Sequence, residues 1–480
     1  MGGGLLQLTF QGQMNISLFY NPQISFFNYA YKKHTNFAIE NIICYFDKSS
    51  GSIDTMHSTT ITASLLRNSD VDLLSNLYFV FKLPNIYSDD KFKFKWVENI
   101  GSLLIKEAKI KIDDIDIDTI TGEWIIVWNE LSMPVKDGFN NMTGNIADLI
   151  NPRKKETTIR IKNNIISEYD YQSSSDISNP SIKERYISVP LPFWFSKNPS
   201  LAIPILKFCS SRKMDVCITL ENIENLYTVY SDIYNMHISP NYYYELYNKK
   251  ISISDFAKKD LNFFAHIEAT YIVLDCYERQ MILNTSITEY LIETVSLKKD
   301  TLSSGGENSI RTIDVSSQIL VKEIIWTLNR KDSVDKFNNI CNYTYSVPNN
   351  NEKSIMKKAH FLWGKGTVKR IDDRDAYYYN NIQPYQHHSI IPRQGIYSYS
   401  FSLYPEKWFP SGCYNGSGIE AQLVLTFNNY EPSLIDDIYM KKFNRVYKDQ
   451  NTNDIIITVY KVEYNILIIK SGVIKFKYTK

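Results

Sequence analysis

Runs of alternating polar and apolar residues, and runs of β-branched and aromatic residues, recur along most of this 480-residue chain. Such runs are typical of β-strands, in which successive side chains point to opposite faces of a sheet. The clearest are NLYFVFKLP, KFKFKW, KIKIDDIDID, MDVCITLE, EAQLVLTF and VIKFKY, which begin at residues 76, 91, 109, 214, 420 and 473. A chain dominated by short strands must bury their apolar faces in sandwiches or barrels, so an all-β fold is predicted.

One segment, TGEWIIVWNELSMP, is predicted to be a helix. Thr121 is a suitable N-cap residue, and Pro134 limits the helix at its other end. The apolar residues between them follow the i, i+3, i+4, i+7 spacing of a single helix face: Trp124, Val127, Trp128 and Leu131. Few other segments show a helical pattern, so this helix is expected to be an exception in the fold.

Length and an internal repetition indicate two domains. A chain of 480 residues suits two large all-β units or about three ordinary domains. The sequence VPLPFWF, a polar loop and the strand KMDVCITLEN are echoed later by SLYPEKWFP, a polar loop and GIEAQLVLTFNN. This repetition predicts two copies of one all-β unit, joined near Asn222 to Tyr230.

Polar stretches between the strands are predicted to be long loops. Loops of this length inside a compact domain usually carry function or reach outward. The four stretches are 150–183, 228–258, 298–311 and 331–386.

The charges of the chain nearly cancel, with 53 lysine and arginine residues against 52 aspartate and glutamate residues and a formal net charge of +1. A protein that coats nucleic acid needs a basic excess or a basic tail, so the charge argues against that class. Lysines and aromatic residues alternate in KFKFKW, a pattern that can bind single-stranded nucleic acid but that a half-buried strand also shows. The neutral total favours the strand, and no direct nucleic-acid partner is expected.

The ends of the chain and the cysteines bear on the compartment. The N-terminal MGGGLLQLTFQGQ has neither the basic start nor the long apolar core of a secretory signal. Near the C-terminus, DIIITVYKVEYNILIIKSGVIKFKY is apolar, but Lys461, Glu463 and Lys470 interrupt it, so strands are expected rather than a membrane-spanning helix. The six cysteines are scattered without a C-x-x-C pair, which favours reduced thiols in a cytosolic setting.

The sequence contains no complete catalytic, cofactor or metal motif. Its seven histidines form neither H-E-x-x-H nor H-x-H, and a P-loop, a dinucleotide fingerprint and a G-x-S-x-G turn are all incomplete or missing. His387 and His388 lie in a proline-bounded loop and are interpreted as a solvated or interface pair. Asp114, Asp116 and Asp118 fit the first ligand positions of an EF-hand loop, but its glycine and its final glutamate are missing. A solvated strand face is expected there, and no catalytic residue, cofactor or metal is predicted.

Five N-x-S/T sequons occur, at Asn15, Asn141, Asn284, Asn342 and Asn415. Without a secretory signal most are interpreted as chance matches in an asparagine-rich chain. Asn342 and Asn415 lie in polar segments and are the two candidates for glycosylation.

Longer stretches resemble the major capsid proteins of the nucleocytoplasmic large DNA viruses, and they keep the order of that family. NPQISFFNYAYKKHTNFAIE resembles the opening of these proteins, and MGGGLLQL before it resembles their N-terminal arm. The later matches are Phe94 to Leu131 with the strand–strand–helix block, Ile187 to Phe208 with the end of the first domain, and EATYIVLDCYERQMIL, EYLIETV, His388 to Gly412 and Tyr464 to Gly472 with the second domain. After Gly412 this chain has CYNGSGIE where the family commonly shows a CNFSRID-like run, so no specific contact is carried over to that loop.

The resemblance implies two tandem eight-stranded jelly rolls with a few short helices and long loops. The arm would comprise residues 1–24, the N-terminal jelly roll residues 25–224 and the C-terminal jelly roll residues 225–480. Three chains would form a pseudo-hexagonal capsomer of an icosahedral shell. The implied partners are other copies of the chain, as a homotrimer and then in neighbouring capsomers, together with minor capsid proteins and the inner membrane at the capsomer base. The chain would be made and assembled in the host cell cytoplasm and would lie in the outer capsid shell of the virion.

We therefore predict a structural subunit of the shell of a large double-stranded DNA virus, not an enzyme. Two alternatives remain open, a low-abundance capsid paralogue and a jelly-roll glycan-binding attachment protein. The second needs an exposed aromatic platform, which the triplets 242–244 and 377–379 of tyrosine could supply. The aromatic corners Phe193 to Phe195 and Trp408-Phe409 are expected to pack in the core or near subunit junctions.

Overall fold

The computed structural model describes residues 3–9, 12–28, 31–52, 58–65, 71–88, 93–113, 115–150, 155–161, 164–170, 180–208, 213–257, 262–303, 309–344, 354–364, 368–428, 454–470 and 472–478. Asp114 and Cys209, which the sequence singled out, lie outside these residues. The chain forms two compact units, Met1–Phe37 and Ala38–Lys480, which are described separately.

The first unit contains two short helices, α1 (Gly3–Thr9) and α2 (Gln13–Phe19). Gly12 precedes α2 in an extended conformation, and Tyr20 ends this helix with a backbone bond to Ile16. No described residue of either helix is buried. The first unit is therefore an arm with local helical structure and no core of its own.

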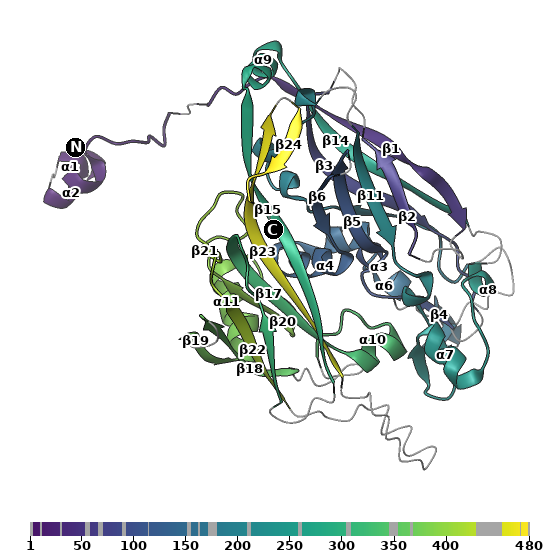
Figure 1. Ribbon diagram of the computed structural model, residues 1–480. Coiled ribbons are helices and arrows are strands. Elements are labelled where there is room, and N and C mark those ends of the chain that lie inside the picture. Colours follow the sequence, from purple (N-terminus) through teal and green to yellow (C-terminus); the bar gives the residue numbers. More distant parts are fainter. Residues whose placement is uncertain are drawn as a thin grey trace. The chain divides into compact units, whose positions relative to one another are not determined.

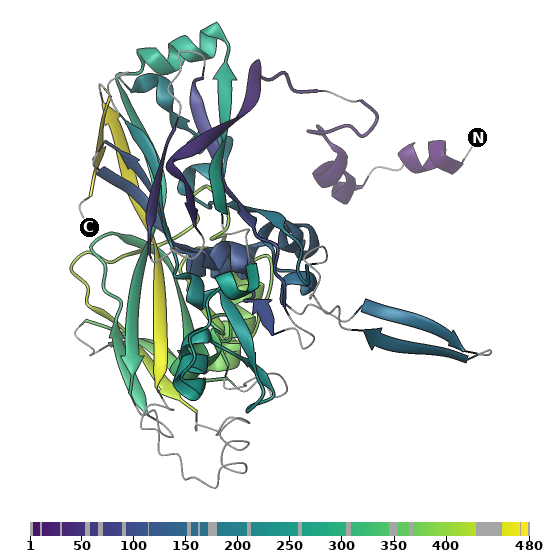
Figure 2. The ribbon, with the colours of Figure 1, turned by 90° about the vertical axis from the view of Figure 1, so that its right-hand side faces the viewer.

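The second unit begins with strands that pair mostly in one large sheet, and we call residues 38–284 its N-terminal half (Figure 1). The nine-stranded sheet has the order β10-β3-β14-β1-β2-β11-β5-β6, with β9 also paired to β3. A three-stranded sheet, β13-β12-β4, and the β7-β8 hairpin, which Figure 2 shows from the side, complete this half. The strands are β1 (Phe37–Ser52), β2 (Thr60–Ser64), β3 (Leu73–Leu83), β4 (Phe94–Trp96), β5 (Ile105–Ile112), β6 (Ile115–Ile120), β7 (Lys155–Ile161), β8 (Asn164–Asp170), β9 (Arg185–Pro190), β10 (Ile203–Pro204), β11 (Met214–Leu220), β12 (Tyr227–Ser231), β13 (Met236–Ile238) and β14 (Asn262–Leu274).

The C-terminal half, residues 285–480, consists of two further antiparallel sheets. One has the order β15-β23-β17-β20, with β21 paired to β17 and β24 to β23, and the other has the order β16-β22-β18-β19. Strands β15 and β23 pair over their whole length, from Ile287 opposite Lys470 to Leu302 opposite Ile455. The strands are β15 (Ile287–Leu302), β16 (Ile310–Asp314), β17 (Leu320–Arg330), β18 (Met356–Trp363), β19 (Val368–Asp375), β20 (Ile396–Ser400), β21 (Tyr414–Asn415), β22 (Ala421–Phe427), β23 (Ile455–Lys470) and β24 (Val473–Phe476).

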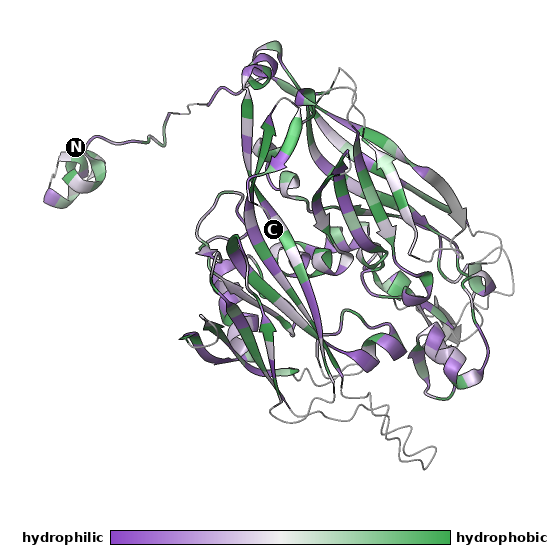
Figure 3. Cartoon of the chain, viewed as in Figure 1, coloured by the Kyte–Doolittle hydropathy of each residue, from purple (hydrophilic) through white to green (hydrophobic). Residues whose placement is uncertain are grey.

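Alternation along the strands produces the cores. Figure 3 shows hydrophobic and hydrophilic residues alternating along many strands, and in β11 every second side chain is buried. One apolar cluster fills the N-terminal half and continues into the face of the C-terminal half that meets it. A second cluster lies between the two sheets of the C-terminal half. The all-β class expected from the sequence is confirmed, and short additional strands extend the sheets beyond eight strands in each half.

Strand β17 is buried on both faces. Ile324, Trp326 and Leu328 point into the core of the C-terminal half, whereas Ile325 points into the core shared with the N-terminal half. Every residue from Val321 to Arg330 is buried as a result. This double burial encloses the apolar run Ile324 to Trp326, and it also encloses the charged residues Lys322 and Glu323 of the same strand.

The predicted helix is confirmed as α4 (Gly122–Ser132). The Thr121 hydroxyl accepts a hydrogen bond from the Trp124 backbone N–H at 3.2 Å, which is the N-cap expected from the sequence. The four apolar residues of the predicted face are buried, but Ile125 and Ile126 on the other side are buried too. The helix is therefore enclosed, because elements of both halves pack around it.

The prediction of four long loops is wrong over much of their length, because tertiary contacts order short elements within them. The stretch 150–183 contains the β7-β8 hairpin, and 298–311 contains the end of β15 and the start of β16. Strands β12 and β13 lie in 228–258, and β18 and β19 lie in 331–386.

Short helices and turns connect the strands. Besides α4, the described helices are α3 (Ile100–Leu103), α5 (Lys136–Thr143), α6 (Ala147–Ile150), α7 (Pro240–Tyr247), α8 (Ser254–Ala257), α9 (Cys276–Asn284), α10 (Lys331–Phe337), the π-helix η6 (Tyr378–Ile382), α11 (Gln383–His387) and the 3₁₀ turns η2 (Trp194–Ser196), η3 (Pro199–Leu201), η4 (Ile205–Lys207) and η5 (Ile223–Asn225).

The expected junction at residue 225 lies within segments that pair with the N-terminal half. Strand β12 pairs with β4, with Tyr227 opposite Trp96. Strand β14 pairs with β3, with Ala265 opposite Phe81. Strand pairing first changes to the C-terminal sheets at β15, which places the change between residues 274 and 287.

Gly122 should not tolerate a side chain. A Cβ atom there would lie 2.0 Å from the Ser102 carbonyl oxygen and 2.3 Å from that of Ile105, and these backbone atoms cannot move aside cheaply. We expect Gly122→Ala to lower the free energy of unfolding by about 1–3 kcal/mol, or to prevent folding, in urea denaturation. The control is Gly138→Ala in the exposed helix α5, where nothing lies within 4 Å and a gain of about 0.5–1 kcal/mol is expected. Equal effects of the two changes would contradict this account of α4 packing.

Candidate assembly surfaces

Two tryptophans of α4 join the halves of the second unit. The Trp124 ring lies 5.2 Å from the Tyr460 ring on β23, measured between centroids. The Trp128 ring meets the His388 imidazole edge-on at 6.3 Å. The two indoles stack on each other at 5.5 Å. Buried aromatic pairs of this kind add about 0.5–1.5 kcal/mol beyond their buried area, so α4 fixes the halves as one body.

An ion-pair cluster reinforces this contact. The Arg393 guanidinium of the C-terminal half donates to the Glu130 carboxylate of α4 at 2.8 Å, and Glu98 lies 3.4 Å from the same guanidinium. Lys136 also pairs with Glu130, at 2.7 Å. Burial raises the pKa of Glu130, but Arg393 and Lys136 outweigh burial and hold that pKa below its ordinary value. The carboxylate is therefore charged at neutral pH and links the halves through Arg393, while Lys136 pairs with it from within the N-terminal half.

A second polar cluster is buried between the halves. Lys322 on β17 lies 2.7 Å from the Glu293 carboxylate on β15, and Lys197 of the N-terminal half pairs with the same carboxylate. The Lys197 ammonium also sits 4.8 Å from the centroid of the Trp128 ring. Burial, assisted by Lys197, lowers the pKa of Lys322 to about 8. Against the effect of burial, the two lysines hold the pKa of Glu293 below its ordinary value, so the cluster is ionised near neutrality.

His388 belongs to a third polar cluster, and its expected place in a solvated or interface loop is wrong. Its side chain is fully buried, with Nε2 3.2 Å from Glu323 on β17 and Nδ1 3.2 Å from Glu406. The Ser389 N–H donates to the same Glu406 oxygen at 2.7 Å. Burial lowers the pKa of His388, but the two glutamates raise it to about 9. These two ion pairs could not be predicted from the sequence, because Glu323 and Glu406 are not neighbours of His388 in the chain.

Large apolar side chains are exposed together on α11 and on the segment 401–412. The His387 imidazole Nδ1 lies 3.3 Å from the Leu403 carbonyl oxygen, which places these two segments side by side. We call the set the assembly patch; its residues and their exposed fractions are Tyr385 78%, Leu403 63%, Tyr404 56%, Trp408 46% and Phe409 41%. Several large apolar side chains gathered in this way mark a protein contact surface.

The first unit, Met1–Phe37, also exposes large apolar side chains. No residue before Lys32 carries a charge, and the side chains of Met14, Phe26 and Phe27 are 80%, 88% and 99% exposed. A segment without charged residues that exposes so many apolar groups is stabilised when another surface covers it. The resemblance had implied an arm at this place.

The two aromatic corners differ in environment. Phe193, Trp194 and Phe195 are buried, and Trp194 contacts Tyr290 of the C-terminal half with ring centroids 5.9 Å apart. Packing in the core, one of the two expected outcomes, is confirmed for this corner. The other corner, Trp408-Phe409, lies in the assembly patch.

Neither tyrosine triplet forms an exposed platform. The triplets lie in α7 and at the start of η6, where consecutive side chains point in different directions. Each triplet has one buried, one half-buried and one exposed ring: Tyr242, Tyr243 and Tyr244 in the first, and Tyr379, Tyr378 and Tyr377 in the second.

The described carboxylates of the acidic run, Asp116 and Asp118, are only partly solvated, which corrects the expected solvated strand face. Asp116 is exposed and pairs with Lys109 at 3.6 Å and Lys111 at 3.2 Å. Asp118 is buried. The pairing of β5 with β6 shifts register beside Ile110, so the two carboxylates do not share one face.

The two candidate glycosylation sites differ in access. Asn415 is exposed on β21. Asn342 is half-buried, and its side-chain oxygen accepts hydrogen bonds from the Thr344 N–H at 3.1 Å and from the Thr344 hydroxyl at 2.8 Å. Glycosylation of either residue stays a prediction, and Asn415 is the more accessible site.

The part of the chain that the structure describes contains neither a candidate metal centre nor a membrane-spanning helix. Its cysteines, Cys44, Cys217, Cys276, Cys341 and Cys413, are free thiols. No group of three or more histidine, cysteine, aspartate or glutamate side chains in this part could hold a metal ion. None of its helices combines the length and the apolar character needed to cross a membrane.

Comparison with known proteins identifies the family. The family model described as large eukaryotic DNA virus major capsid protein matches residues 278–474, and the model of the major capsid protein N-terminus matches residues 25–253. The chain belongs to the major capsid proteins of large eukaryotic DNA viruses. A probable capsid protein of Acanthamoeba polyphaga mimivirus is 26% identical to this capsid protein, over 97% of each chain. The major capsid protein of Phaeocystis pouchetii virus is also 26% identical, over 98% of each.

Solved structures show the fold of this capsid protein. A quasi-atomic model of the PBCV-1 virus capsid covers 95% of this chain and 100% of its own, with a TM-score of 0.67 and 21% identity. The Faustovirus major capsid protein covers 96% and 94%, with a TM-score of 0.64 and 12% identity. The fold is the double jelly roll that the resemblance implied.

The stability of this capsid protein should depend on the protonation of His388. Because its folded pKa of about 9 exceeds the ordinary value of 6.5, the charged imidazole stabilises the fold. This contribution is complete below about pH 6.5 and is lost as the pH rises through about 9. We expect His388→Gln to lower the free energy of unfolding by about 3 kcal/mol at pH 6, and by much less at pH 10, in urea denaturation.

The neighbouring His387→Gln is the control for this measurement. His387 is half-buried and makes no ion pair with a described residue, so its replacement should have little effect at either pH. The pKa of Lys322 is lowered in the folded protein, so its effect on the free energy of unfolding changes with pH in the opposite direction to that of His388. Each variant is therefore compared with the parent at the same pH, because both proteins contain Lys322. A deficit for His388→Gln that is equal at pH 6 and pH 10 would show that its ion pairs do not stabilise the fold.

Proposed function

We propose that this chain is the structural subunit of an icosahedral viral shell and assembles as a homotrimer into pseudo-hexagonal capsomers. The observation that carries the proposal is the presence of two jelly rolls in one chain of the major capsid family. Three such chains give six similar β units around one axis, which suits a hexagonal lattice position. The same subunit could also be a low-abundance paralogue, and quantification of the protein in purified virions distinguishes the two.

The assembly patch supports contacts between copies. A homotrimer buries large and partly apolar surfaces, because the subunits do not function apart. The exposed rings of Tyr385, Trp408 and Phe409 are of the residue types enriched at the centres of such contacts. Glu406, two residues before Trp408, pairs with buried His388 and anchors the segment that carries Trp408 and Phe409. A pre-ordered patch loses little conformational entropy on association.

We propose that the arm faces the capsomer base, where its partners are minor capsid proteins or the inner membrane. Its exposed apolar side chains and lack of charge before Lys32 support such a contact. The near-zero net charge supports a shell subunit that does not bind the genome directly. The protein would be made and assembled in the host cell cytoplasm, and assembly, not catalysis, would be its activity.

We also propose a division of the chain that differs from the expected boundary at residue 225. The N-terminal jelly roll would extend through β14 and the C-terminal one would begin with β15. The strand pairings support this division, as do the two family models, which match residues 25–253 and 278–474 separately. The arm would end near residue 37, where the second compact unit begins.

The oligomeric state tests the proposed trimer. Size-exclusion chromatography with light scattering should give three times the chain mass of 55.9 kDa at micromolar concentration. Replacing Trp408 and Phe409 together by serine should shift the protein toward the monomer, because their loss removes apolar area from the contact. Tyr277→Ser on α9 is the control, since this ring is 70% exposed but lies outside the patch. A stable monomer of the parent protein would refute the trimer.

Removal of residues 1–24 tests the arm. No described residue of this segment is buried, so the shortened protein should keep the thermal unfolding midpoint and the oligomeric state of the parent. Its incorporation into virus shells should fall, because the contacts at the capsomer base are lost. Normal incorporation of the shortened protein would contradict the proposed role, whereas a lowered unfolding midpoint would show that the arm stabilises the fold instead.

A further inference from the structure

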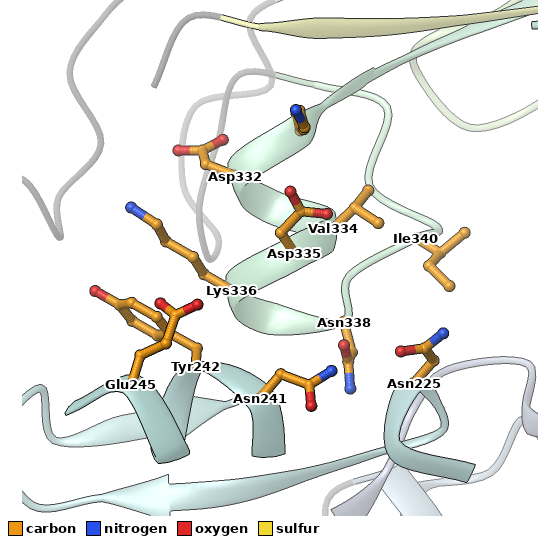
Figure 4. A pocket seen from close by; sticks show the side chains of 11 residues that line it. Asn225, Asn241, Tyr242, Glu245, Asp332, Val334, Asp335, Lys336, Asn338 and Ile340 are labelled. Carbon is orange, nitrogen blue, oxygen red and sulfur yellow. The ribbon is translucent and has the colours of Figure 1, made fainter. Parts of the chain in front are cut away.

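A cavity of about 500 Å³ lies between α7 of the N-terminal half and α10 of the C-terminal half (Figure 4). Its size falls within the range of about 300–1,000 Å³ that is usual for small-molecule sites. The lining side chains come from three segments, η5, α7 and the stretch 331–340. The cavity is therefore complete only when the two halves are packed together, and neither the capsid fold nor the assembly patch accounts for it.

The walls of the cavity are already fixed. The Asn338 amide nitrogen donates to the backbone oxygens of Glu224 and Tyr227, each at 2.8 Å, and so ties α10 to the segment around η5. Ser239, the N-cap of α7, donates through its N–H to the Lys336 carbonyl at 2.7 Å and through its hydroxyl to the Asp335 carbonyl at 2.8 Å. A ligand would meet a preformed site and would not have to order it.

One carboxylate of the cavity wall, that of Asp332, is held by a buried cation. Arg330 is almost fully buried, and its guanidinium donates from Nε to Asp332 Oδ1 at 2.9 Å and from Nη2 to the other oxygen. This pair gives a charged group at the cavity wall a fixed orientation. Asp332 can still accept a hydrogen bond on the cavity side, because a carboxylate has about four acceptor positions.

Other polar groups at the cavity have unused hydrogen-bonding capacity. Asn241, Glu245 and Asp335 are exposed at its rim. Among the described residues, none makes a side-chain hydrogen bond with Asn241 or Glu245. Burial and Asp332 raise the pKa of Asp335 while Lys331 and Lys336 lower it, and the net shift is upward, as for a carboxylate that lacks a close partner. The cavity therefore presents both donors and acceptors to a ligand.

Apolar surface accompanies these groups. The Tyr242 ring is buried, stacks on Tyr234 with centroids 6.0 Å apart and lies 5.4 Å from the Lys336 ammonium. Its hydroxyl is bonded to that of Tyr234 at 2.9 Å, so the ring is held in position. Val334 and Ile340 also line the cavity, and Figure 4 shows them on the α10 side opposite Tyr242. A ligand with apolar C–H faces and polar hydroxyl edges would satisfy both kinds of lining.

The charged residues that line the cavity indicate whether an anionic, a cationic or an uncharged ligand fits best. The carboxylates Glu245, Asp332 and Asp335 are balanced by Lys331, Lys336 and the Arg330 that pairs with Asp332. A phosphate or an acidic sugar would meet three carboxylates, and a metal ion would lie beside the lysine cations. An uncharged ligand rich in hydroxyl groups encounters neither penalty.

We propose that this cavity binds an uncharged saccharide, such as a neutral hexose unit of a glycan. The amides and carboxylates bind its hydroxyl groups, Val334 and Ile340 contact its C–H face, and Tyr242 closes the opposite wall. This site uses one chain and does not depend on the trimer. It differs from an exposed aromatic platform, because the ring that takes part is the buried member of its triplet.

Sugar binding to the intact protein tests the proposal. Glucose, galactose, mannose, N-acetylglucosamine and their β-linked disaccharides are titrated by calorimetry and by saturation-transfer NMR. At least one should bind with a Kd of about 1 mM or tighter. The double variant Asn241→Ala with Glu245→Ala should weaken this binding at least about tenfold, because each removes a hydrogen bond to the ligand. Both side chains are exposed, so the fold should be kept, and an unchanged unfolding midpoint verifies this.

Tyr244→Ala is the matched control on the same helix. Its ring is exposed but does not line the cavity, so binding should be unchanged. Loss of binding in the control alone would place the ligand on the exposed tyrosines and would overturn the proposal. It would also be overturned if no saccharide binds, if the double variant binds normally, or if inorganic phosphate or calcium binds while the neutral sugars do not.

Discussion

The burial of β17 on both faces is the constraint on which the rest of this molecule depends. One face completes the core of the C-terminal jelly roll through Trp326 and its neighbours, and the other meets the N-terminal jelly roll. A strand so enclosed cannot leave a polar group unpaired without a cost of about 1–3 kcal/mol or more. Lys322 and Glu323 occupy this strand and must therefore find charged partners on other elements.

Those partners make one rigid body out of two jelly rolls. Glu293 pairs with both Lys322 and Lys197, and His388 pairs with Glu323. Helix α4 adds its tryptophans and the Glu130–Arg393 pair to the same boundary. Buried ion pairs are weak evidence of net stability, but a wrong relative position of the halves would leave each charge unpaired. They therefore fix the geometry of the subunit, which a capsomer that tiles a shell requires.

The surfaces left over by this packing differ in chemistry. The assembly patch is aromatic, and the arm has no charged residue before Lys32 and exposes its described residues, so both suit protein or membrane contacts in a shell. The cavity between α7 and α10 is polar and balanced in charge, and it suits a small hydroxylated ligand. A single chain thus separates the surfaces proposed for assembly from the one proposed for recognition.

The sequence by itself determined the local structure that short-range rules govern. The alternating runs become β3, β11 and β22, and the Thr121 cap and its apolar spacing become α4, because neighbours in the chain set strand alternation and helix capping. The family motifs likewise carried the double jelly roll and the capsid identity. Only the tertiary structure decided the pairing of β14 with β3, the burial of His388 and the opposite environments of Phe193 and Trp408. Each of these depends on partners far away in the chain, and no local pattern of residues encodes such contacts.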